Sequence, residues 1–150
     1  MVDERELQGA YLQFQAIKEQ IEAGIKEKGM VDQKLVEIIQ AKSAIKELQS
    51  IKDKREVWTP VGAGSFVSAD LKHTGEVAVA LGAGIVAKKS SSEAIDILQK
   101  REDELSAAER ELVKGLQSMQ AHANQLETFM QQAINEMESN KAEPKKSGNN

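Results

Sequence analysis

The sequence contains no cysteine, which excludes disulfide bonds, thiolate metal sites and thiol redox chemistry. Its only prolines are Pro60 and Pro144, so long helices are permitted on both sides of the middle of the chain. Aromatic residues make up 3% of the chain and charged residues 29%, which is a lean supply for a compact core. The composition therefore favours a rod over a globule.

Long apolar runs are also missing. No run approaches the roughly eighteen residues of a membrane span, and the charged start lacks the apolar stretch of a secretory signal. We expect a soluble protein with no membrane partner. Twenty basic and twenty-four acidic residues are interspersed along the chain and leave a net charge of -4, which makes nucleic acid a poor candidate partner.

The apolar residues before the middle of the chain recur at alternating steps of three and four, the pattern of a coiled-coil seam. We expect this first helix over about residues 3 to 54, with Asp3 and Glu6 as a capping box. Near its C-terminal end the basic residues Lys52, Lys54 and Arg55 place positive charge where the helix dipole is negative. Two lysines interrupt the apolar pattern. The seam positions are Leu7, Ala10, Phe14, Ile17, Ile21, Gly24, Lys28, Val31, Leu35, Ile38, Lys42 and Ile45.

A second seam is the strongest periodic signal and predicts a helix over about residues 91 to 140. Its start is marked by Ser90 and Glu93, because serine three residues before glutamate is typical of a helix N-terminus. The seam extends back from its continuous part through Leu105, Leu98 and Ala94. The continuous part consists of Leu112, Leu116, Met119, Ala123, Leu126, Met130, Ala133 and Met137.

Between the helices the apolar period changes to two, which predicts strands. Glycine-rich turns divide the segment into four short strands near residues 57–61, 65–71, 76–81 and 85–89, which we interpret as two consecutive hairpins. Residues 61–65 and 81–85 look alike and lie twenty residues apart. They indicate either one hairpin design used twice or two independent glycine turns.

These elements predict an α+β chain in which the helices pair in antiparallel fashion. Phe14 is then expected to face Met130, Leu7 to face Met137, and Gly29 to lie opposite Gly115. We expect domain boundaries at 1–56 for the first helix, 57–90 for the hairpins, 91–140 for the second helix and 141–150 for a disordered tail. Isolated hairpins are only marginally stable in water, so we expect the two hairpins to form a platform together with partner subunits.

The order of these elements resembles the prefoldin α subunits over nearly the whole chain. The most specific stretch runs from Pro60 to Phe66 and is similar to the archaeal form of the family signature. The residues 82–84, followed by Lys88, also belong to the pattern. Two hairpins in place of one point to the α class.

The resemblance implies a hetero-hexamer of two α and four β subunits whose hairpins assemble into a β-barrel platform. It implies an ATP-independent holding chaperone of the cytoplasm, which binds unfolded client proteins at the ends of the coiled coils and delivers them to a group II chaperonin. It also implies that there is no cofactor, no metal and no catalytic residue. The alternative is a structural or adaptor coiled coil without chaperone activity.

Apolar residues near the two chain ends exceed what one narrow seam can bury, so we expect some of them to be exposed. We predict that they bind clients, although seam packing alone also explains several of them. The predicted client-binding residues are Leu7, Tyr11, Leu12, Phe14, Phe129, Met130, Ile134 and Met137.

The apolar residues of the hairpins are predicted to form the oligomerisation surface. Trp58, the sole tryptophan, lies at the entry to the first hairpin, where an aromatic ring favours packing between subunits. The predicted oligomerisation residues are Trp58, Val61, Phe66, Val67, Leu71, Val77, Val79, Leu81 and Ile85.

The sequence gives little support for an enzymatic site. Neither glycine cluster is followed by the Gly-Lys-Ser or Gly-Lys-Thr of a phosphate-binding loop. His73 and His122 each lack a second histidine at metal-ligand spacing, and no nucleophile, histidine and acid can be grouped. We therefore predict that the protein is not an enzyme.

Overall fold

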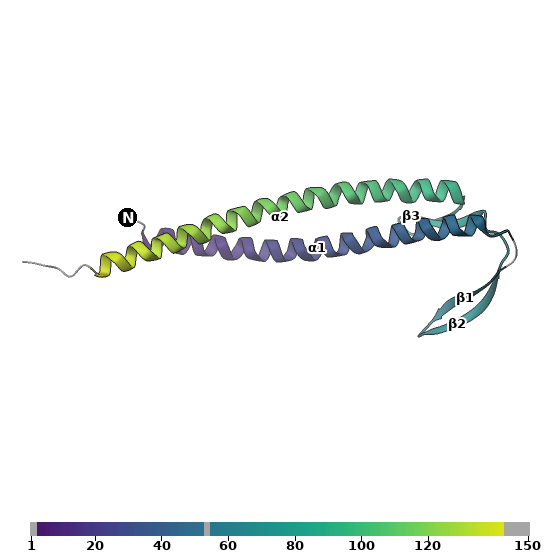
Figure 1. The fold of residues 1–150 in the computed structure, drawn as a ribbon, viewed down its shortest axis with the longest axis horizontal. Coiled ribbons are helices and arrows are strands. Elements are labelled where there is room, and N and C mark those ends of the chain that lie inside the picture. Colours follow the sequence, from purple (N-terminus) through teal and green to yellow (C-terminus); the bar gives the residue numbers. More distant parts are fainter. Residues whose placement is uncertain (1–2, 53–54, 143–150) are drawn as a thin grey trace, which may run out of the picture. The chain divides into compact units, whose positions relative to one another are not determined.

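The computed structural model describes residues 3–52 and 55–142, with side chains as far as residue 139, and the predicted tail from residue 143 onward lies outside this part. Its elements are α1 (Glu4–Ser50), β1 (Arg55–Gly62), β2 (Ser65–Leu71), β3 (Glu76–Gly82), β4 (Ile85–Ser90) and α2 (Ser91–Ala142). The strands form two separate antiparallel hairpins, β1–β2 and β3–β4 (Figure 1). The predicted α+β class, with two long helices and two hairpins, is confirmed.

The chain divides into two compact units, and each contains a stretch of both helices. The terminal unit combines Met1–Met30 with Glu109–Asn150, and the hairpin unit is Val31–Ala108. In each unit the two helical stretches run antiparallel (Figure 1). In the part of the chain that is described, neither helix has a stretch long and apolar enough to cross a membrane.

The predicted seams are the buried faces of the helices. Every predicted seam position from Leu7 to Ile45 on α1, and from Ala94 to Met137 on α2, is buried or half-buried. The most deeply buried seam residues are small, because small side chains let two helices approach closely; they are Ala10, Gly24, Ala94, Ala123 and Ala133. A coiled-coil seam therefore takes the place of a globular core.

The register predicted for the terminal unit is wrong by about one helical turn. Gly24 packs against Leu116, whose Cδ2 atom lies 2.6 Å from where a Cβ on Gly24 would be. Neither Gly29 nor Gly115 has a neighbour within 4 Å of its would-be Cβ, so these glycines do not pack against each other. Any shift by whole turns keeps apolar residues on the seam, and the apolar pattern alone therefore left the register open.

Two seam lysines form polar contacts across the helix pair. In the terminal unit, Lys28 Nζ lies 3.3 Å from Glu109 Oε1. In the hairpin unit, Lys42 pairs with Glu102 and donates a hydrogen bond of 2.6 Å to Gln99 Oε1, with 12% of its side chain exposed. A polar residue at a seam position favours one register over others, because a shifted register would bury its charge without a partner.

The start of α2 has the predicted capping box. Ser90 Oγ accepts a hydrogen bond from the Glu93 backbone N–H at 3.2 Å, and the Glu93 carboxylate accepts one from the Ser90 backbone N–H at 3.1 Å. The pKa of Glu93 is lowered by the Ser90 backbone N–H, then by the Ser90 hydroxyl and by the charge of Lys89. At the start of α1, Glu6 likewise accepts the Asp3 backbone N–H at 3.3 Å.

The C-terminal end predicted for the first helix is wrong. Helix α1 ends at Ser50 and its last turn contains no basic residue, while Arg55 already belongs to β1. Lys54 lies outside the described residues. The basic cluster suggested a favourable interaction with the helix dipole, but Arg55 pairs with Leu71 of the neighbouring strand, and strand pairing therefore decides its conformation.

The two hairpins share one turn design, which supports the prediction of a repeated unit. Ala63 and Gly64 of the first turn have φ values of 49° and 74°, and Ala83 and Gly84 of the second have 49° and 76°. Positive φ at both central residues is the type I′ geometry that suits the twist of a hairpin. In both hairpins the register shifts just before the turn.

Within the hairpin unit, the second hairpin contacts the chain's own helix. Arg101 of α2 donates a hydrogen bond to the Ala80 carbonyl oxygen of β3, and the neighbouring Val79 is buried. Ser91, at the start of α2, is also buried; its N–H bonds to the Gly75 carbonyl at 3.0 Å and its hydroxyl to the Thr74 carbonyl at 3.2 Å. These contacts fix the link between β3–β4 and α2.

Candidate functional site

An open groove of about 450 Å³ lies between the helices of the terminal unit, close to the start of α1. We call it the terminal groove. It is lined by Glu4, Leu7, Gln8, Tyr11, Met130 and Ile134. Most of its lining is apolar, although both helix stretches are solvated on their outer faces.

The structure brings four of the eight predicted client-binding residues together in the terminal groove, namely Leu7, Tyr11, Met130 and Ile134. Tyr11 is 51% exposed and Ile134 41% exposed, so the groove presents apolar surface to solvent. Leu7 and Met130 are half-buried seam residues that also line it. Met137, the predicted partner of Leu7, is not among the residues that line the groove.

The other four predicted residues lie outside the groove. Leu12 is 60% exposed and Phe129 is 36% exposed, so both present apolar side chains on the outer surface of the terminal unit. Met137 is half-buried at its seam position. Phe14 is also half-buried and lines a second cavity, and its predicted partner Met130 is not among the residues that line this cavity.

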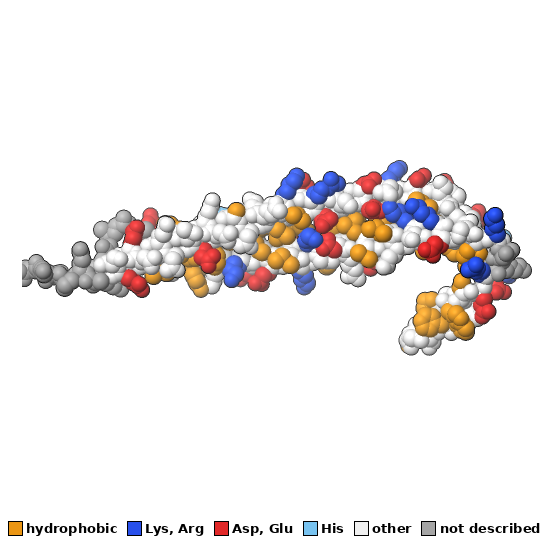
Figure 2. Space-filling model, viewed as in Figure 1, with side chains coloured by type: hydrophobic (Ala, Val, Ile, Leu, Met, Phe, Trp, Pro, Cys, Tyr) orange, Lys and Arg blue, Asp and Glu red, His pale blue; other side chains and the backbone are white. Residues whose placement is uncertain are grey.

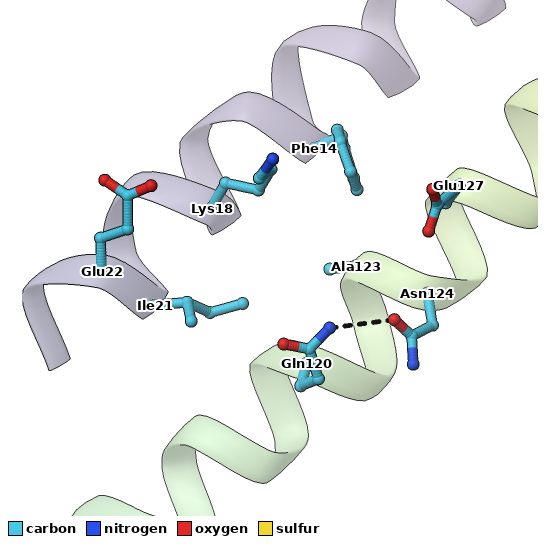
Figure 3. A pocket seen from close by; sticks show the side chains of 8 residues that line it. All are labelled: Phe14, Lys18, Ile21, Glu22, Gln120, Ala123, Asn124 and Glu127. Atoms are coloured by element: carbon cyan, nitrogen blue, oxygen red, sulfur yellow. Dashed lines mark hydrogen bonds between the residues drawn. The ribbon is translucent and has the colours of Figure 1, made fainter. Parts of the chain in front are cut away.

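This second cavity, of about 260 Å³, has a mixed polar and apolar lining (Figure 3). The ammonium group of Lys18 lies over the Phe14 ring, 5.6 Å from its centroid, in a cation–π contact. On α2, Gln120 donates a hydrogen bond of 3.0 Å to Asn124. The remaining lining residues are Ile21, Glu22, Ala123 and Glu127.

Two polar residues of the groove, Glu4 and Gln8, were not predicted from the sequence. Glu4 and Gln8 are spaced by four residues, so they share a helix face next to the seam with the predicted residue Tyr11, which follows Gln8 by three. Counting outward from the seam position Leu7 would have found them. The carboxylates Glu22 and Glu127 line the second cavity from opposite helices, and that placement depends on the helix register.

A second candidate surface lies on hairpin β1–β2, where hydrophobic side chains gather (Figure 2). Trp58 is 68% exposed and Phe66 is 58% exposed, and they lie on the same face because Trp58 pairs with Ser68 and Pro60 with Phe66. The other exposed predicted oligomerisation residues are Val61, Val67, Leu81 and Ile85. Leu71 and Val77 are half-buried, and Val79 is buried in the chain's own fold.

These features define a class of protein: a helical coiled-coil subunit with small apolar hairpins and an apolar groove near its helix ends. A model of the prefoldin subunit family matches residues 17–136. The chain belongs to the prefoldin family. Prefoldins are non-enzymatic chaperones, so membership assigns the chain the role of a chaperone subunit.

Relatives and solved structures agree with this family. Prefoldin subunit alpha of Methanosarcina barkeri is 29% identical over 136 residues, which cover 84% of this chain and 94% of the relative. Prefoldin subunit alpha of Thermofilum pendens is 33% identical over 63% of this chain and 73% of the relative. The fold is similar to filamentous PFD from Methanocaldococcus jannaschii, with a TM-score of 0.70 and 22% identity over 79% of this chain and 98% of that one.

Proposed function

We propose that the chain is the α subunit of an ATP-independent holding chaperone that captures non-native proteins at the terminal groove. The exposed apolar side chains of Leu12 and Phe129, which follow Tyr11 and precede Met130 in the sequence, extend the capture surface. The chain assembles through its hairpins with β subunits, in a cytoplasmic hexamer of two α and four β subunits. This hexamer delivers its clients to a group II chaperonin and needs no nucleotide, metal or catalytic residue.

One observation carries the proposal: the terminal groove and its surroundings expose large apolar side chains that the seam does not need. Leu12 and Ile134 lie off the seam, with 60% and 41% of their surfaces exposed. Exposed apolar surface costs free energy in water, and an unfolded client that covers it recovers about 25 cal/mol per Å² of buried surface. A passive coiled coil gains nothing from such residues.

The test is an aggregation assay with a chemically denatured client, run with and without ATP. We expect the double variant Leu12→Ser/Ile134→Ser, assembled with a β subunit, to suppress aggregation at least about threefold less than the wild type, because it loses two apolar contacts. ATP should make no difference. Native mass spectrometry should show the same assembly for both proteins.

A matched control is Ile25→Ser/Ile39→Ser, which removes two aliphatic residues of similar exposure (59% and 51%) from α1 at positions outside the groove. We expect this control to suppress aggregation like the wild type. Equal losses in both double variants would show that the groove has no special role. A wild-type complex that forms but does not suppress aggregation would favour the structural or adaptor coiled coil.

A further inference from the structure

We infer that the terminal groove prefers apolar client segments flanked by lysine or arginine over those flanked by acidic residues. This inference rests on the proposed function and adds a class of substrate to it. The occupant is a segment of a non-native protein with an aliphatic centre and basic flanks. The apolar lining of the groove would contact the aliphatic centre of the segment. The negative charges around the groove would attract its basic flanks.

The charges around the groove are mostly negative. Within residues 3–18 and 123–139, whose side chains are described, six carboxylates stand against two basic residues, Arg5 and Lys18. All six carboxylates are on exposed residues, namely Asp3, Glu4, Glu6, Glu127, Glu136 and Glu138. The chain as a whole is close to balanced, with 20 basic and 24 acidic residues, so this imbalance is local.

Three of these carboxylates border the groove directly or lie one turn from it. Glu4 is part of the lining. On α2, Glu127 precedes Met130 by three residues and Glu138 follows Ile134 by four, so both share the helix face that lines the groove. One turn is roughly 5 Å along the helix, which is shorter than the Debye length of about 8 Å in physiological salt. Their charges therefore act on a segment bound in the groove.

Helix stability explains only some of these six carboxylates, which together we call the acidic rim. Asp3, Glu4 and Glu6 lie at the N-terminal end of α1, where negative charge interacts favourably with the helix dipole. Glu138, in contrast, lies near the C-terminal end of α2 (Ser91–Ala142), where the same dipole disfavours a carboxylate. A role in binding accounts for an acidic residue where helix stability would favour a basic one.

The experiment uses fluorescein-labelled peptides with one short aliphatic core and with lysine, serine or glutamate flanks. Their binding to the full chain, assembled with a β subunit, is measured by fluorescence anisotropy at about 20 mM and about 300 mM NaCl. We expect the lysine-flanked peptide to bind roughly fivefold more tightly than the glutamate-flanked one at low salt, because each exposed charge pair contributes little by itself. The difference should shrink at high salt.

The variant Glu127→Gln/Glu138→Gln removes two rim charges from solvent-exposed positions. It should reduce the preference for lysine flanks to less than about twofold and leave the affinity for the serine-flanked peptide unchanged. The matched control Glu104→Gln/Glu111→Gln makes the same change in charge on exposed residues of α2 outside the groove. The control should keep the preference of the wild type.

The outcomes separate this inference from the proposed function. If the serine-flanked peptide binds but lysine and glutamate flanks bind equally, the charge preference is wrong and capture by the groove still stands. If none of the peptides binds, the groove is not a capture site and both proposals fail. If the control variant loses the preference as well, the net charge of the chain causes it and the inference about the rim is overturned.

Discussion

Gly24 and Gly29 lie five residues apart in the middle of α1, but their surroundings differ. A Cβ on Gly24 would lie 2.6 Å from Leu116 Cδ2, whereas a Cβ on Gly29 would meet nothing within 4 Å. Glycine in a helix interior costs about 1 kcal/mol relative to alanine. Gly24 therefore serves the close approach of the two helices, and nothing in the structure requires a glycine at position 29.

We accordingly expect Gly29→Ala to raise the free energy of unfolding by about 1 kcal/mol, the gain in helix propensity. Gly24→Ala should give a smaller gain or a loss, because the side chain of Leu116 must move to make room. Urea unfolding followed by circular dichroism measures both. Equal stabilisation by the two substitutions would mean that Gly24 and Leu116 are not in contact in solution.

At the scale of elements, the sequence predicted the buried face of each helix but not how the two faces match. Each seam position from Leu7 to Ile45 is shielded in the structure because burial recurs with the helix period, and that period is visible in a single segment. The register depends on pairs such as Gly24 with Leu116 and Lys42 with Glu102, which are distant in sequence. The apolar residues of the terminal groove follow the helix period and were therefore predicted. The carboxylates around the groove come together only once the two helices are paired, so they were not predicted.

The capping box of α2 makes stability depend on pH. Because the folded chain holds the pKa of Glu93 below its ordinary value of 4.5, the unfolded state binds the proton more readily. The stabilisation is therefore complete above pH 4.5 and is lost as the pH falls through the lowered pKa. Glu93→Gln should remove this part of the acid dependence, whereas Glu104→Gln, in the middle of α2, should leave it in place.

The measurement is the unfolding midpoint between about pH 3 and pH 7, which spans the titration of an ordinary glutamate. The difference between the wild type and Glu93→Gln should be largest at neutral pH and should narrow below pH 4.5. Ser90→Ala, which removes the serine hydroxyl of the capping box, should lower the free energy of unfolding by about 1 kcal/mol. A difference that is constant with pH would contradict the role of the Glu93 charge.

At the scale of the whole molecule, the two hairpins are covered to different degrees. The second hairpin buries Val79 and is tied to α2 through Arg101, whereas the first exposes Trp58 and Phe66. Two-stranded hairpins are marginal by themselves. We therefore expect the first hairpin to depend on other subunits more than the second does, a difference that the similar sequences of the two turns did not reveal.

Phe66 should therefore matter for assembly with a β subunit, and it should not matter for the stability of the separate chain. Phe66→Ala should weaken the complex in native mass spectrometry by roughly fivefold or more and leave the unfolding of the separate chain unchanged, because truncating a well-packed interface aromatic commonly costs over about 1 kcal/mol. Val79→Ala should instead destabilise the separate chain by roughly 1 to 3 kcal/mol, because it removes a buried side chain.

The sole tryptophan, Trp58, is 68% exposed in the single chain, so its fluorescence should shift to the blue when the wild type assembles. An emission spectrum that does not change during assembly would show that the first hairpin lies outside the interface.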